Sequence, residues 1–236
     1  MKKEPRFIYY LFSPFLRIFH WIMVFCTIVL FVTGLWITKP LSGGVSMEPI
    51  FGSILLSLHF VRYMHSFAAF IFVAAFILRI YGFVMYKGDR LFPRFWEEAF
   101  WRGSKDVLLH YMFLRPSHKP YLRNPLARIS YVAIYSMMLI QIVTGFAMRV
   151  TVDPNAFGAG LFSWIIRIWD SEFMLHLIHH YVAWLIVFVT IPHIYMVVRE
   201  DFMEREGEVS SMFSGVKIFK HKPLDLRDIV DEKNTK

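Results

Sequence analysis

The stretch Phe173–Val198 reads FMLHLIHHYVAWLIVFVTIPHIYMVV and contains no Asp, Glu, Lys or Arg among its 26 residues. At about 1.5 Å of rise per residue, a helix of this length can cross a hydrocarbon core of about 30 Å. The stretch nevertheless carries four histidines, and ionisable side chains at membrane depth are costly and usually functional. We therefore expect a membrane-spanning helix whose histidines have specific partners.

The spacing of these histidines divides them between faces of the helix. His179 and His193 are 14 residues apart, which at about 100° per residue falls about 40° short of four full turns. These two share one face and lie roughly 21 Å apart along the axis. His180 points elsewhere, so we expect supporting or interfacial roles for it and for His176. Two imidazoles on one face at different depths can serve two haems.

Composition places the whole chain in a membrane. Its 236 residues are 56% hydrophobic, above the value of about 45–50% in soluble domains. We expect residues 1–236 to form a single membrane domain that binds two haems. The single cysteine, Cys26, cannot supply the motif for covalent haem attachment, so the haems would be of the b type. The net charge of +8 comes from basic loops, which indicates topology rather than nucleic-acid binding.

Four long apolar runs predict an all-α membrane protein, a bundle of four transmembrane helices. They cover about 18–38, 60–86, 129–149 and 173–198. The connection 87–127 is rich in Lys and Arg and contains an amphipathic segment, expected as an interfacial helix with His110 and His118 solvated or interfacial. Residues 199–236 read as a polar, partly disordered tail. The basic segments fall on one side, so we expect a multi-pass protein of the cytoplasmic (inner) membrane with both termini cytoplasmic.

Topology sorts the histidines into two pairs by depth. His20 and His193 fall on the cytoplasmic side, and His65 and His179 on the outer side. Each pair would give a haem iron with two imidazole ligands and no open position, which suits electron transfer. Taken singly, His20 beside Trp21 could be interfacial, and His65 could belong to a small-residue helix contact. A histidine-lined transporter remains the alternative for the whole set.

Other residues are candidates for contact with the haems. Arg17 lies one turn before His20 and could meet a cofactor carboxylate. Arg79 follows His65 by 14 residues, so it is either a cofactor contact on the same face or an interfacial cation. Gly34 and Gly145 end a shared Val-Thr-Gly in the first and third spans. They indicate close helix packing, or room for a flat macrocycle, or both.

The chain resembles the b-type cytochrome subunit of membrane-bound nickel–iron hydrogenases over about residues 14–217. The similar segments are RIFHW, RYMHSFAAF, HHYVAWLIVFVTIPHIYMVVRED and EREGEVSSMFSGVK. Cytochrome subunits of formate dehydrogenase and thiosulfate reductase share a similar four-helix plan. The sequence Arg-Glu-Asp at 199–201 and the tail after it favour hydrogenase, although Ser211 stands where that family usually has Thr.

This resemblance implies a function in electron transfer. An iron–sulfur small subunit, paired with a nickel–iron large subunit outside, would pass electrons through the two haems to a quinone, menaquinone or ubiquinone. The quinone would bind near the inner haem, around Arg17, His193 and residues 199–215. The chain itself would have no centre that cleaves H₂. The alternative partner is formate dehydrogenase or another quinone-linked oxidoreductase.

Overall fold

The structure is a computed structural model. It describes residues 6–38, 57–85, 93–116, 121, 124–156, 158–169, 171–204 and 206–223. Residues 39–56 of the connection 39–58, which is expected as a short loop between the first two spans, lie outside these ranges, as do His118 and the tail beyond residue 223.

Within the described ranges, four helices are long and apolar enough to cross a membrane. They are α1 Pro14–Thr38, α2 Leu58–Met85, α4 Pro125–Val152 and α6 Glu172–Glu204. The helices coincide with the four apolar runs, and α6 continues through Pro192 beyond residue 198. Long uncharged runs form helices in a membrane because a helix satisfies its own backbone hydrogen bonds. The all-α membrane fold class is therefore confirmed.

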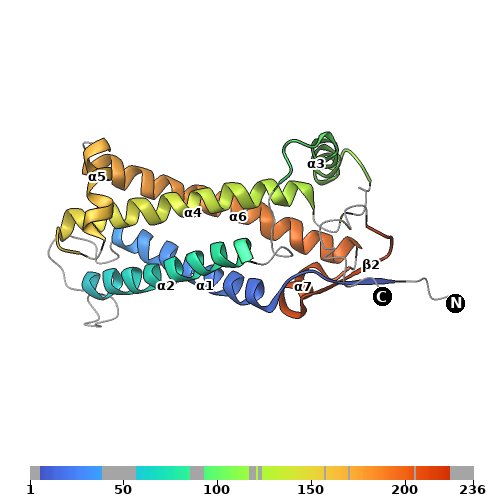
Figure 1. The fold of residues 1–236 in the computed structure, drawn as a ribbon, viewed down its shortest axis with the longest axis horizontal. Coiled ribbons are helices and arrows are strands. Elements are labelled where there is room, and N and C mark those ends of the chain that lie inside the picture. Colours follow the sequence, from blue (N-terminus) through green and yellow to red (C-terminus); the bar gives the residue numbers. More distant parts are fainter. Residues whose placement is uncertain are drawn as a thin grey trace. The chain divides into compact units, whose positions relative to one another are not determined.

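The chain divides into two compact units, of which the first is Pro14–Tyr86. We call it the α1–α2 unit, because these two helices lie side by side within it (Figure 1). Close packing at one end depends on a glycine. A Cβ added at Gly82 would lie 2.4 Å from Cε1 of Phe15, so the ring occupies the place where any other residue would have a side chain.

The second unit comprises Met1–Ser13 and Lys87–Lys236, and we call it the α4–α6 unit. Its two long helices run side by side, with α5 (Ala159–Trp169) at one end and α3 (Glu98–Tyr111) at the other (Figure 1). Asn124 caps α4, because its side chain accepts hydrogen bonds from the backbone N–H groups of Leu126 and Ala127. The apolar centre between α4, α5 and α6 consists of Ala147, Ile165 and Leu175.

The tail is expected to be polar and partly disordered, and the part of it that the structure describes contains regular secondary structure. Helix α7 (Glu208–Ser214) leads into strand β2 (Val216–Phe219), which pairs antiparallel with β1 (Phe7–Tyr10). The side chain of Phe219 is 1% exposed. Buried Lys217 forms an ion pair with Glu208. Burial alone would lower the pKa of Lys217, but the nearby glutamates raise it and the net shift is upward.

The expected amphipathic helix of the connection 87–127 is present as α3, but the solvated alternative for His110 was wrong, while its interfacial position stays a prediction. Its side chain is 3% exposed rather than solvated. Nδ1 of His110 lies 3.1 Å from the carbonyl oxygen of Arg115, and Nε2 lies 3.0 Å from Nη1 of Arg199 on α6. His110 is thus a structural link between α3 and the C-terminal end of α6.

Candidate functional site

His65 lies on α2 against the Val-Thr-Gly of α1. Its Nδ1 is 2.8 Å from Oγ1 of Thr33. The same hydroxyl donates to the carbonyl oxygen of Val29, at 2.6 Å, one turn earlier in α1. Thr33 therefore connects the backbone of its own helix to the imidazole of the neighbouring helix.

His179 lies on α6 in the same arrangement against the Val-Thr-Gly of α4. Its Nδ1 is 2.8 Å from Oγ1 of Thr144, and that hydroxyl donates to the carbonyl oxygen of Ile140 at 2.7 Å. The backbone carbonyl of His179 also accepts a hydrogen bond of 2.7 Å from Nε2 of Gln141. Each unit thus contains one histidine held by one threonine, and we call these two arrangements the His65 seat and the His179 seat.

Each threonine can serve its imidazole as an acceptor. A threonine hydroxyl has one proton and two lone pairs. When Thr33 and Thr144 donate to the backbone carbonyls, their oxygens are left to accept from Nδ1–H of the histidines. Nε2 of each ring then presents a lone pair. A neutral imidazole with one nitrogen held by a hydrogen bond and a lone pair on the other is the form that binds a metal, so the donor set fits haem iron.

The glycines after the two threonines face the same imidazoles. A Cβ at Gly34 would lie 3.5 Å from Cε1 of His65, and one at Gly145 would lie 3.4 Å from Cε1 of His179. These are ordinary contact distances, so the imidazole alone does not require glycine. The next nearest ring atom at each glycine is Nδ1, at 4.0 Å, so the glycines face the ring edge that the threonines also contact. This position is consistent with close helix packing, and room for a macrocycle at these glycines stays a prediction.

The neighbouring histidines of α6 are held differently. Nε2 of His180 accepts a hydrogen bond of 3.2 Å from the indole N–H of Trp184, which occupies the lone pair that a metal would need. Nδ1 of His176 lies 2.9 Å from the carbonyl oxygen of Glu172 in the first turn of the helix, and this contact is exposed. Supporting or interfacial roles for His176 and His180 remain our prediction.

The residues expected at the inner haem lie on separate helices. His20 and Arg17 are half-buried one turn apart on α1, with the His20 ring 5.2 Å from that of Trp21. His193 is half-buried on α6. Arg79 on α2 is 4% exposed, and both interpretations of this residue stay predictions. Each proposed pair takes one histidine from each unit, and each pairing stays a prediction.

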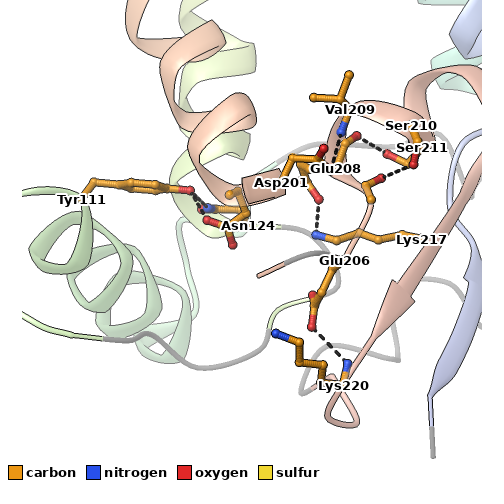
Figure 2. A network of polar contacts seen from close by, with 12 residues as sticks. Tyr111, Asn124, Asp201, Glu206, Glu208, Val209, Ser210, Ser211, Lys217 and Lys220 are labelled. Carbon is orange, nitrogen blue, oxygen red and sulfur yellow. Dashed lines mark hydrogen bonds and ion pairs between the residues drawn. The ribbon is translucent and has the colours of Figure 1, made fainter. Parts of the chain in front are cut away.

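A polar network surrounds the C-terminal end of α6, where the sequence predicts the quinone. The hydroxyl of Tyr111 donates to Glu200 at 2.9 Å, and Asn124 donates to that hydroxyl at 3.4 Å. Asp201 accepts from the backbone of Val209 at 3.3 Å, at the start of α7 (Figure 2). Burial and the Glu200 carboxylate raise the pKa of Tyr111, so its phenol keeps its proton as the donor.

Thr33 and Thr144 were not predicted from the sequence as residues that contact the histidines. The repeated Val-Thr-Gly drew attention to Gly34 and Gly145, while the residues in direct contact with the histidines are Thr33 and Thr144. The repeat itself was the signal, because an identical polar residue at one position of two apolar spans needs a partner in each.

Comparison with known proteins shows the family of the chain. A family model described as prokaryotic cytochrome b561 matches residues 11–215. The chain is 31% identical over 220 residues to the "Probable Ni/Fe-hydrogenase B-type cytochrome subunit" of Rhizobium leguminosarum, a match that covers 89% of each chain. It is also 31% identical over 221 residues to the "Probable Ni/Fe-hydrogenase 1 B-type cytochrome subunit" of Escherichia coli, covering 90% of this chain and 92% of the relative. The chain therefore belongs to the prokaryotic cytochrome b561 family and is a multi-pass membrane cytochrome of the b type.

Proposed function

We propose that this cytochrome is the membrane subunit of a nickel–iron hydrogenase and that it holds two b-type haems. The names of its relatives in Rhizobium leguminosarum and Escherichia coli support the hydrogenase partner. When bound, the haems would carry single electrons from the iron–sulfur subunit of the hydrogenase to a membrane quinone, menaquinone or ubiquinone. The nickel–iron large subunit would be the site of H₂ cleavage.

The two histidine pairs would bind haems at different depths in the membrane. His65 and His179 would ligate the haem nearer the donor, and His20 and His193 the haem nearer the quinone. The observation that carries the proposal is the equivalence of the His65 and His179 seats, since in each a threonine hydroxyl lies 2.8 Å from Nδ1 of the histidine, and Nε2 would be the ligating nitrogen. Two imidazoles per iron leave no open coordination position, which favours electron transfer over oxygen chemistry.

The remaining candidates would bind the polar parts of the cofactors. Arg17 and Arg79 are placed on helices that also carry a proposed ligand, and their guanidinium groups are suited to haem carboxylates. The quinone would bind near His193 and the segment 199–215, which is ordered by α7 and the network around Glu200. The basic segments support an inner-membrane protein with both termini cytoplasmic and the hydrogenase on the outer face.

Purification of the complex from its native membrane tests this proposal. We expect about two haems b per cytochrome polypeptide, together with an iron–sulfur subunit and a nickel-containing subunit. A reduced-minus-oxidised spectrum should show the b-type signal, and H₂ should reduce it. Recovery of formate dehydrogenase or another iron–sulfur dehydrogenase in place of hydrogenase would show the alternative partner to be correct. A preparation with no b-type signal would refute both and favour a transporter.

A further inference from the structure

We propose that Thr33 and Thr144 are positioning residues that set the tautomer and the donor strength of His65 and His179, and thereby the midpoint potential of one haem. This inference rests on the proposed function, because it requires that these two histidines ligate the same haem. Neither threonine would touch the iron. Each would act through the imidazole that its hydroxyl holds.

The two units contain the same hydrogen-bond arrangement between a threonine and a histidine. The Oγ1–Nδ1 distance is 2.8 Å for Thr33 with His65 and 2.8 Å for Thr144 with His179. Both hydroxyls also donate to the carbonyl four residues earlier, at 2.6 Å and 2.7 Å. A threonine that only satisfied itself within a helix would need the carbonyl alone, as Thr38 does with Gly34.

The apolar surroundings of the imidazoles favour a neutral acceptor for Nδ1–H. In an apolar span no water is available to accept this proton, so an internal acceptor is required. A carboxylate would accept it more strongly but would add a charge at membrane depth, which is costly. A hydroxyl whose own proton is committed to the backbone is a neutral acceptor of fixed direction. It excludes the tautomer with the proton on Nε2, which could not ligate iron.

The same hydrogen bonds would affect the midpoint potential of the haem iron. A hydrogen bond from the non-ligating ring nitrogen raises the basicity of the ligating nitrogen. A more basic imidazole stabilises ferric iron relative to ferrous iron, so the two threonines together would lower the midpoint potential of the haem held by His65 and His179. The haem held by His20 and His193 would not be affected by either residue.

The test uses the complete cytochrome in its complex and replaces each threonine with the isosteric Val. Thr38→Val is the matched control for Thr33→Val in α1, and Thr151→Val is the control for Thr144→Val in α4. The control hydroxyls donate to carbonyls of their own helix, at 2.9 Å to Gly34 and 2.7 Å to Met148. Thr→Ser variants at 33 and 144 keep the hydroxyl and serve as the rescue.

Potentiometric titration of the b-type absorbance is the readout. The hydrogen bond is present in both oxidation states, so only the difference between its two strengths shifts the potential. Its loss should move the reduced-to-oxidised ratio of one haem toward the reduced form at fixed ambient potential, and a whole ordinary hydrogen bond, about fivefold, is the upper limit. The other redox step should stay in place, and the double Val variant should show roughly the product of the two single effects. The Ser variants should titrate like the unmodified protein, and loss of the haem in a Val variant with recovery in Ser would equally support the inference.

The outcomes separate this inference from the proposed function. If His65→Ala and His179→Ala each remove a haem while both Thr→Val variants titrate like their controls, the inference is wrong and the haem assignment stands. Haem loss that Ser does not restore would also overturn it, because the effect would then be one of shape. If neither His→Ala variant loses a haem, the proposed ligands themselves are refuted.

Discussion

The adjacent histidines of α6 offer a sharp contrast, because replacing one should remove a haem and replacing the other should not. The Thr144 hydroxyl contacts Nδ1 of His179, so Nε2 is the nitrogen that we propose as the ligand, whereas Nε2 of His180 accepts from Trp184. The two side chains are about 100° apart around the helix. His179→Ala should therefore remove a ligand, and His180→Ala should remove only an exposed hydrogen bond.

The expected size follows from the number of ligands. With two haems per chain and two histidines per haem, loss of His179 should lower the haem content by about half. His193 serves the other haem, so the remaining half should keep its spectrum and potential. His180→Ala should retain the full haem content, because its hydrogen bond to Trp184 is exposed and would hold no haem.

The assay is the ratio of haem to polypeptide in the purified complex, measured by the pyridine haemochrome spectrum. His176→Ala is the second control, since its Nδ1 bonds to the first turn of its own helix. A retained haem with a five-coordinate, high-spin spectrum in His179→Ala would also identify the ligand. Full haem content in His179→Ala with loss in His180→Ala would refute the reasoning from both the helix face and the hydrogen bonds.

Three further substitutions test packing, the space beside the imidazole, and the polar network. Gly82→Ala should destabilise the protein by about 1–3 kcal/mol, since its Cβ would lie 2.4 Å from the Phe15 ring; an unchanged melting temperature would contradict this packing. Gly145→Val should lower haem content without unfolding the chain, whereas Gly160→Ala, whose Cβ would have no described atom within 4 Å, should do neither. The pKa of Tyr111 is raised, so its contribution to stability is complete below about pH 10 and is lost as the pH rises further. In thermal melts, Tyr111→Phe should therefore lose less stability at alkaline pH than the unmodified protein does. An identical pH profile for the two proteins would contradict this role of Tyr111.

The fold class was predictable from the sequence because hydropathy and length alone specify spanning helices. The 14-residue spacing to His193 also favours His179 over His180 as the ligand. The contacts of His179 with Thr144 and of His180 with Trp184 are consistent with this prediction. Both inferences use only local geometry, which a helix fixes in advance. Contacts between helices could not be obtained in the same way.

The errors share one cause, which is the dependence of burial on distant partners. His110 lies in a charged and aromatic segment that is typical of an interface, yet Arg199, far along the chain, encloses it. The tail is rich in charge, yet Glu208 neutralises Lys217, and pairing with β1 orders strand β2. The two threonines were missed for the same reason, since periodicity within one span does not reveal which side chain of the next helix lies opposite.

Pairing of Phe7 with Phe219 has a consequence for the biogenesis of the chain. The strand that precedes the first span is synthesised before any spanning helix, and its partner is synthesised after all four. During translation β1 must therefore remain an open edge, and exposed edges of this kind promote aggregation. The two strands can pair only after all four spans have been translated. A chain that ends before Val216 would therefore carry an unpaired β1 strand, which a membrane protease or chaperone could recognise.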